Sequence, residues 1–189
     1  GISYKYKRDV KEVIGDVYLN TIILGGIAYI STFLLALFLG IYCALHEDKI
    51  MDRIIITVGN ITSCIPSFWI SLILILILGV NLAILPTSGA YSIGMSENIC
   101  DRIIHLILPL IVLILGHLWY YAYMVRNKIL EEMREDYVLL AKVKGLNKRQ
   151  IIYSHCLRNI APSFITIMAV SVPHILAGTY VVERVFSYP

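Results

Sequence analysis

Long stretches without a charged residue dominate the sequence. No Asp, Glu, Lys or Arg occurs in four segments, residues 17–45, 54–96, 103–125 and 159–182. A helix needs about 20 apolar residues to cross the hydrocarbon core of a bilayer, and a soluble helix of such length would carry a polar stripe, which these segments lack. The pattern predicts four membrane helices, over residues 17–45, about 54–80, 102 to about 125, and about 159–182.

Prolines interrupt the apolar segments. Pro66 lies near the middle of the second segment, where it removes one backbone hydrogen bond and predicts a kink. The kink is either a packing feature or a break that lines a transport pathway. Further along, Leu85-Pro86-Thr87-Ser88-Gly89 combines proline and glycine at a spacing typical of a turn. We expect this turn to lie outside the cell.

A polar stretch, residues 126–158, separates the third and fourth segments. If it is cytoplasmic, so is the short turn at 46–53, and the inner side then holds ten of the 16 Lys and Arg residues. Cytoplasmic loops carry an excess of Lys and Arg. The charge distribution therefore favours this orientation.

The polar stretch has a helical pattern of its own. Apolar residues recur three or four apart over 128–144, which predicts an amphipathic helix. Gly145 then supplies a helix stop, and Asn147 with Gln150 has the spacing of a capping box for a second helix over 148 to about 157. By this pattern alone, the two short helices could lie on the lipid surface or dock in a groove of a partner protein.

Composition agrees with the membrane assignment and narrows the function. Hydrophobic residues make up 58% of the chain and charged residues 15%, whereas soluble proteins have nearer half and a quarter. The net charge of +3 is too small to indicate a nucleic-acid partner. The sequence contains no GxxxxGK[ST], HExxH or GxSxG motif, so we expect no catalytic residue and no cofactor on this chain. A membrane-embedded enzyme is the least favoured interpretation.

Histidines and cysteines offer no recognisable metal site. His105, His117 and His174 are candidate ligands, but His105 and His117 share a helix face only roughly, and His174 lies on another segment. His105 is also expected near a helix end, without a carboxylate that pairs with it in the sequence. The four cysteines are scattered, without a CxxC or Cys/His cluster. We therefore predict no metal site and treat the cysteines as packing residues.

Several short motifs occur in a fixed order along the chain. They are Ile65-Pro66-Ser67-Phe68-Trp69, Leu85-Pro86-Thr87-Ser88-Gly89, His105-Leu106-Ile107-Leu108-Pro109, Glu135-Asp136-Tyr137-Val138, Ala141-Lys142-Val143-Lys144-Gly145-Leu146, His155-Cys156-Leu157-Arg158-Asn159 with Pro162, Gly178, Val181-Val182-Glu183, and Val185-Phe186-Ser187-Tyr188-Pro189. Together they resemble the motifs of binding-protein-dependent ABC importer permeases. Their residues are most similar to those of the dipeptide, oligopeptide and nickel branch. One departure is Leu139-Leu140-Ala141, where the general loop motif has Glu-Ala-Ala, although this branch often lacks that glutamate.

The resemblance implies an all-α, polytopic membrane protein with the core of a type I ABC importer permease, of which four of six expected helices are present. Residues 1–189 would form a single permease domain, with a cytoplasmic coupling loop at 126–159. Because the chain starts at Gly1 and stops at Pro189 after an apolar span, we expect it to be an internal part of a larger protein.

The resemblance also implies partners and a location. The expected partners are a second permease subunit, cytoplasmic ABC ATPase subunits that bind ATP and Mg²⁺, an extracytoplasmic solute-binding protein and membrane lipid, but no nucleic acid. The expected location is the bacterial inner membrane. The cargo is expected to be di- or oligopeptides, with nickel or another metal chelate as the alternative.

Candidate site residues follow from the matched motifs. The residues implied to couple to the ATPase are Glu135, Asp136, Tyr137, Ala141, Lys144, Gly145, Leu146, Arg158, Asn159 and Pro162. The residues implied to line the pathway or its gate are Pro66, Ser67, Trp69, Gly178 and Glu183.

Overall fold

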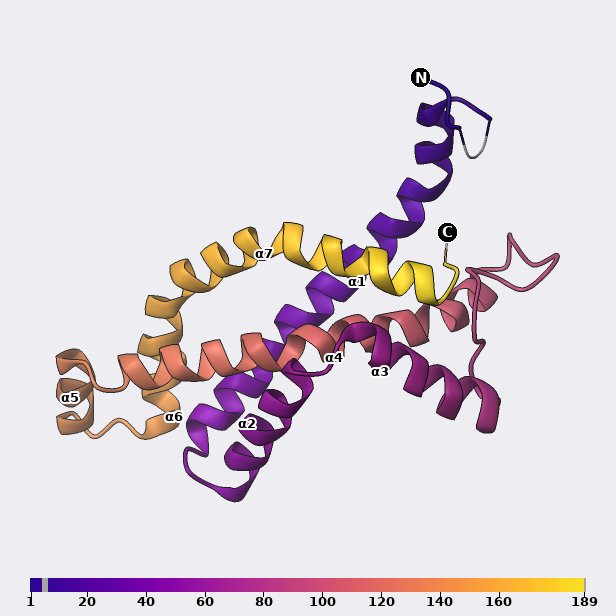
Figure 1. The fold of residues 1–189 in the computed structure, drawn as a ribbon. Coiled ribbons are helices and arrows are strands. Elements are labelled where there is room, and N and C mark those ends of the chain that lie inside the picture. Colours follow the sequence, from indigo (N-terminus) through magenta and orange to yellow (C-terminus); the bar gives the residue numbers. More distant parts are fainter. Residues whose placement is uncertain (5–6, 189) are drawn as a thin grey trace. The chain divides into compact units, whose positions relative to one another are not determined.

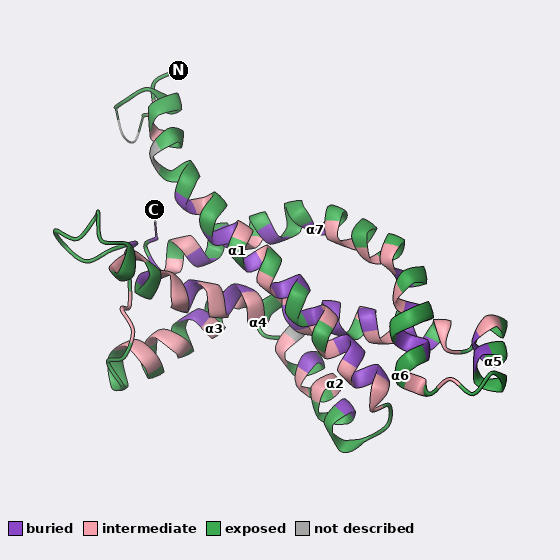
Figure 2. Ribbon diagram, turned by 180° about the vertical axis from the view of Figure 1, so that it is seen from behind, coloured by how far each residue is buried: buried purple, intermediate pink, exposed green. Residues whose placement is uncertain are grey.

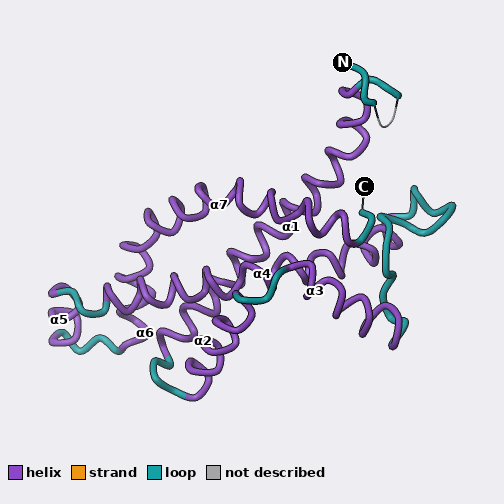
Figure 3. The backbone as a smooth tube through the Cα atoms, viewed as in Figure 1, coloured by secondary structure: helices purple, strands orange, loops and turns teal. Residues whose placement is uncertain are grey.

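The described part of the chain is helical. The computed structural model describes residues 1–4 and 7–188, and within them it contains no β-strand, only an isolated bridge between Ile2 and Asp9 (Figure 3). In order, the elements are α1 (Val10–Leu45), α2 (Ile50–Ser63), α3 (Ser67–Leu74), the π-helical turn η1 (Ile75–Asn81), α4 (Ile99–Glu132), α5 (Asp136–Val143), α6 (Lys148–Ile151), the π-helical turn η2 (Ile152–Cys156) and α7 (Leu157–Val185) (Figure 1). The predicted all-α class is confirmed.

Among the described residues, three helices are long and apolar enough to cross a membrane. They are α1, α4 and the continuous helix Lys148–Val185, and the pair α2 and α3 adds a fourth if it forms one span. Many of their apolar side chains are exposed (Figure 2), among them Leu34, Ile165 and Val170. Lipid would cover such side chains in a bilayer, so the exposure agrees with the predicted polytopic membrane protein.

The second apolar segment is broken rather than kinked. Instead of one helix over 54–80, α2 ends at Ser63 and α3 begins at Ser67, with Pro66 as its N-cap at φ −60° and ψ 140°. Proline disfavours the helical conformation in the residue before it, here Ile65, and also lacks an N–H to continue the hydrogen-bond ladder. The prediction of a single helix was wrong for this reason.

The helices around the polar stretch also differ from those predicted. The expected helix over 128–144 is two helices, because α4 runs to Glu132 and α5 starts anew at Asp136. The expected separate helix over 148–157 is the first part of a helix that continues through Pro162 to Val185. The missing N–H of Pro162 costs one hydrogen bond, and its carbonyl still accepts a bond from Thr166 Oγ1 at 2.9 Å.

Contacts between residues divide the chain into two compact units. The first comprises residues 1–30, 66–114 and 175–189, and the second comprises residues 31–65 and 115–174. In the first, Leu24, Leu108 and Phe186 are fully or almost fully buried in one hydrophobic cluster. The loop between η1 and α4 attaches to this unit, because the Gly89 N–H donates to the Phe186 carbonyl at 2.8 Å. Gly89 has a φ of +85°, which suits glycine and confirms the predicted turn.

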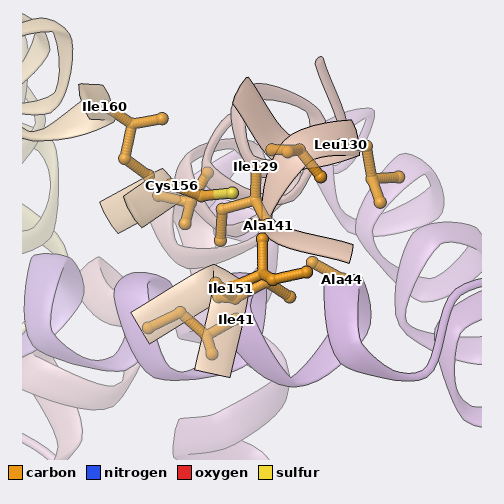
Figure 4. Close-up of a cluster of buried hydrophobic side chains, with 11 residues drawn as sticks. Ile41, Ala44, Ile129, Leu130, Ala141, Ile151, Cys156 and Ile160 are labelled. Atoms are coloured by element: carbon orange, nitrogen blue, oxygen red, sulfur yellow. The ribbon is translucent and has the colours of Figure 1, made fainter. Parts of the chain in front are cut away.

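The second unit has its own hydrophobic core. Its buried members are Ile41, Ala44, Val125, Ile129, Leu130, Val138, Ala141, Ile151, Ile152, Cys156 and Ile160. Figure 4 shows side chains from α1, α4, α5, α6 and the start of α7 meeting in this cluster. The core therefore anchors the short helix α5 to the ends of three long helices.

Candidate functional site

Helix α5 is anchored by its inward face. Glu135 is the N-cap residue, in an extended conformation, and Asp136 places a carboxylate in the first turn, where it interacts favourably with the helix dipole. Val138 and Ala141, three residues apart, are both buried in the core of the second unit. This spacing directs one face of the helix onto α4 and α6.

The remaining apolar residues of α5 are not covered. Leu139, Leu140 and Val143 are 63%, 56% and 79% exposed. A helix of eight residues thus presents three large aliphatic side chains to its surroundings while its opposite face is packed. Such an uncovered apolar face is typical of a surface that binds another protein.

Gly145 ends α5 in a Schellman motif. The Leu146 N–H donates to the Ala141 carbonyl at 3.2 Å, and the Gly145 N–H donates to the Lys142 carbonyl at 2.9 Å. Gly145 has a φ of +84°, the left-handed conformation that this motif requires. Leu146 then packs against the core. The predicted helix stop is confirmed.

The second predicted cap is also present. Asn147 Oδ1 accepts from the Gln150 N–H and Gln150 Oε1 accepts from the Asn147 N–H, each at 2.9 Å. This is the reciprocal pair of a capping box. Next to it, Lys148 Nζ lies 3.6 Å from a Glu47 carboxylate oxygen, in the turn after α1. The start of the last long helix is therefore fixed by local polar contacts.

Glu132 connects the end of α4 to α5 and to the start of α7. Its carboxylate accepts hydrogen bonds from the Tyr137 hydroxyl and, at 3.2 Å, from Asn159 Nδ2. Burial raises the pKa of Tyr137, and the hydrogen bond to Glu132 raises it further, so the phenol stays protonated and donating. Glu132 was not predicted from the sequence, because a glutamate five residues before a tyrosine has no distinctive spacing.

A buried ion pair holds α2 against α4. Arg126 Nε lies 2.7 Å from Asp52 Oδ1, and Arg126 Nη2 lies 2.6 Å from Asp52 Oδ2. The side chains are only 12% and 1% exposed, respectively. Asp52 also accepts from the Asp48 N–H at 3.0 Å. This bidentate pair was not predicted from the sequence, where its only signal is an acidic residue in a short turn beside an apolar segment.

The structure separates the two predicted sets of site residues. All the predicted coupling residues belong to the second unit, in which Arg158, Asn159 and Pro162 are exposed near the start of α7. The predicted pathway residues Pro66, Ser67, Trp69, Gly178 and Glu183 all belong to the first unit. Their roles stay predictions.

Two of these pathway candidates have notable environments. Trp69 is 55% exposed on α3. Glu183, on α7, has one carboxylate oxygen that is buried without a hydrogen-bond partner among the described residues. The neighbouring Arg184 places its guanidinium 5.3 Å from the centre of the Tyr180 ring. A buried, unpaired carboxylate oxygen is costly, and Glu183 thus remains a candidate gate residue.

The candidate histidines fall into two places. His105 lies in the first unit, where its Nδ1 is 3.0 Å from the Gly89 carbonyl oxygen and its Nε2 is 3.3 Å from Ser92 Oγ. Its Nε2 also lies 3.8 Å from Asp101 Oδ2, so the expectation that no carboxylate pairs with His105 was wrong. His117 and His174 lie in the second unit with their rings in contact. Within the described part of the chain, no group of three or more His, Cys, Asp or Glu side chains could hold a metal ion.

Comparisons with known proteins agree with the membrane helices described above. Residues 36–189 match the family described as "Binding-protein-dependent transport system inner membrane component". The chain is 33% identical over 180 residues, 95% of its length, to the oligopeptide transport system permease protein AppB of Bacillus subtilis (strain 168), of which it covers 57%. It is 34% identical over its whole length to the metal-staphylopine import system permease protein CntB of Staphylococcus aureus (strain Mu50 / ATCC 700699), again covering 57%.

A third relative completes the comparison. The di/tripeptide transport system permease protein DppB of Pseudomonas aeruginosa (strain UCBPP-PA14) is 32% identical over 184 residues, and the chain covers 54% of it. The chain thus spans little more than half the length of these relatives. Because the family match covers most of the chain and the helices suit a multi-pass inner-membrane protein, the chain belongs to the family of binding-protein-dependent transport system inner membrane components.

Proposed function

We propose that the full-length protein is the transmembrane permease subunit of an ABC importer that moves di- or oligopeptides across the inner membrane. Family membership and two peptide-permease relatives support this function. In this proposal the chain itself catalyses nothing. A separate cytoplasmic subunit binds ATP and Mg²⁺ and carries out the hydrolysis.

The observation that carries the proposal is that helix α5 has one face buried in the core and another apolar face exposed. Val138 and Ala141 fix it to the core, while Leu139, Leu140 and Val143 stay exposed. We assign the exposed apolar face to the ATPase, because a short helix with aliphatic anchors on one face fits a groove on a partner protein. The segment 126–159 is then the coupling loop.

The contacts around α5 supply a route for motion. A displacement of α5 would be transmitted to α4 and α7 through the hydrogen bonds that join Tyr137, Glu132 and Asn159. It would also act through the shared hydrophobic core. Closure of the ATPase pair would thereby tilt the membrane helices. Well-packed cores transmit such displacements because their interiors are nearly incompressible.

The remaining partners follow from the same function. A second permease subunit would complete the translocation pathway, and an extracytoplasmic solute-binding protein would deliver the cargo. The exposed aliphatic surface of the long helices is available to the second subunit and to lipid. Pro66, Ser67, Trp69, Gly178 and Glu183 are proposed to belong to the pathway or its outer gate.

A metal-chelate cargo is the second candidate. The observation in its favour is the 34% identity to a permease of a metal-staphylopine import system, which extends over the whole chain. The peptide-permease relatives are similar to nearly the same extent, at 33% and 32% identity.

Substitutions of Gly145 test the proposed coupling loop. Beyond its two chain neighbours, no residue has an atom within 4 Å of where a Cβ at Gly145 would lie, so the φ of +84° is the main constraint. A residue other than glycine in this conformation costs roughly 1–2 kcal/mol, less for asparagine and more for a β-branched residue. We expect Gly145→Val in the full-length protein to reach the membrane normally but to lose substrate-stimulated ATP hydrolysis and ATPase co-purification.

Gly145→Asn is the matched control. We expect this variant to keep both substrate-stimulated ATP hydrolysis and ATPase co-purification, since asparagine tolerates a positive φ. The measurements are ATP hydrolysis by the reconstituted complex and the amount of ATPase recovered with the permease. If Gly145→Val retains both at wild-type levels, the loop is not the coupling element, and a hairpin lying on the lipid surface becomes the better explanation.

A further inference from the structure

A cavity lies between α4 and α7 within the second unit. It has a volume of about 630 Å³, and its lining residues all belong to these two helices, among them Tyr120 and Met124 on α4 and Thr166, Val170 and His174 on α7. Cavities that hold small organic molecules measure about 300–1,000 Å³. The cavity is therefore large enough for a di- or tripeptide.

The cavity offers no counter-charge to an ionised side chain. None of the described residues that line it is Asp, Glu, Lys or Arg, and the two helices contain no such residue over 103–125 and 159–182. An ionised group that leaves water needs an opposite charge or several hydrogen bonds, and its transfer is very costly without them. The cavity thus suits apolar and aromatic side chains better than charged ones.

Two side chains of the lining have open hydrogen-bonding groups. The Tyr120 hydroxyl and the His174 imidazole make no hydrogen bond to any described residue, and each ring only contacts a neighbouring aromatic ring. A lipid acyl chain supplies no partner for such groups, and an unpaired polar group at membrane depth is costly. The N–H and C=O groups of a peptide do supply partners. Ionisable residues within membrane segments commonly mark a substrate pathway.

The sides of the cavity leave room for the charged ends of a peptide. Tyr120 and Val170 line the cavity and are nevertheless 58% and 74% exposed. A peptide with a central side chain between α4 and α7 can thus keep its terminal ammonium and carboxylate groups in water. The charge-free lining then discriminates between side chains and not between peptide termini.

We propose that this cavity is a transit site for peptide cargo with uncharged side chains. The cargo side chain enters between α4 and α7, and the Tyr120 hydroxyl and the His174 imidazole form hydrogen bonds with the amide groups of the peptide. The inference rests on the proposed import of peptides and adds a selectivity to it. Peptides with apolar or aromatic side chains pass this site more readily than peptides with Lys, Arg, Asp or Glu side chains.

The test uses the full-length transporter in proteoliposomes, with its ATPase and its solute-binding protein. ATP-driven uptake is measured for the tripeptides Ala-Leu-Ala and Ala-Lys-Ala, and the lysine-to-leucine uptake ratio is compared between wild type and variants. The binding protein is the same in every measurement, so its own preference cancels. Val170→Asp places a carboxylate in the cavity. We expect it to raise the ratio roughly tenfold, because a charge-assisted hydrogen bond then becomes available to the lysine ammonium group.

Ile165→Asp is the matched control. Ile165 lies on the same helix and is 63% exposed, but it does not line the cavity. This variant should leave the lysine-to-leucine ratio at the wild-type value. An equal rise in both variants would overturn the transit site, as would uptake by Val170→Asp at an unchanged ratio.

Two apolar variants serve if an aspartate in the membrane segment prevents assembly. Val170→Phe narrows the cavity without adding a polar group, and Ile165→Phe is its control. We expect Val170→Phe to lower the uptake of Ala-Phe-Ala relative to Ala-Ala-Ala roughly tenfold, and Ile165→Phe to leave this ratio unchanged. An unchanged ratio in Val170→Phe would overturn the site. Loss of the second permease subunit from that variant, at an unchanged ratio, would identify the cavity as a subunit interface instead.

Uptake by wild type separates this inference from the proposed function. If wild type takes up peptides with ATP while the uptake ratios do not depend on Val170, only the transit site fails. If wild type takes up no peptide with ATP, the peptide-import function itself fails.

Discussion

The ion pair between Asp52 and Arg126 yields a quantitative prediction. Two short contacts, of 2.6 and 2.7 Å, join these residues on α2 and α4. Asp52 is 1% exposed, so removing Arg126 leaves a buried carboxylate without its main partner. Breaking one side of a buried pair costs about 3–5 kcal/mol. We expect Arg126→Met or Asp52→Asn to lower the free energy of unfolding by this amount.

The double variant distinguishes a buried pair from two independent effects. Asp52→Asn with Arg126→Met removes both charges, and the loss should be smaller than the sum of the single losses by about 2 kcal/mol. The matched control is the exposed pair Lys128–Glu131, whose 2.7 Å contact is as short but whose side chains are 46% and 63% exposed. Such a surface pair contributes only about 0–1 kcal/mol.

The assay is equilibrium unfolding of the full-length protein in detergent, followed by tryptophan fluorescence. Trp119, on α4 in the same unit, provides a nearby reporter. Strictly additive losses at Asp52 and Arg126 would refute the reasoning. So would losses at this pair no larger than those at the exposed control pair.

Two further predictions concern packing in the second unit. A Cβ at Gly40 would lie 2.8 Å from the Ala122 carbonyl oxygen. Gly40→Ala should therefore force α1 and α4 apart and lower the free energy of unfolding by about 1–3 kcal/mol in the same assay. Unchanged stability would contradict this close approach of the two helices. Val138→Ala should lower the free energy of unfolding by about 2 kcal/mol, because Val138 is fully buried. Leu139→Ala should change it by less than about 0.5 kcal/mol yet reduce ATPase recovery. Equal stability losses for the two variants would show that the two faces of α5 were assigned wrongly.

Features set by neighbouring residues could be predicted from the sequence. Gly145 and the pair Asn147 and Gln150 act within a few residues of themselves, and both the positive φ and the capping box are present. The charge-free segments likewise indicated the long helices, because membrane length depends on local composition. Such signals do not need the partner element to be known.

The break between α4 and α5 and the distant partners could not be predicted. The apolar spacing of Met133 and Tyr137 continues across the turn that separates α4 from α5, so periodicity concealed the break. Asp52 and Arg126 are 74 residues apart, and periodicity shows which face of a helix is apolar but not which helix it meets. The contact between the rings of His117 and His174 could not be predicted for the same reason.

Site-specific photo-crosslinking from α5 tests the central claim most directly. A photoreactive amino acid is placed at Leu139 or Val143 in the full-length protein, within membranes that contain the whole transporter. The control position is Ile93, which is fully exposed in the loop between η1 and α4. The account predicts a covalent adduct with the ATPase from Leu139 and Val143 and none from Ile93. Adducts with lipid alone from the α5 positions would contradict it.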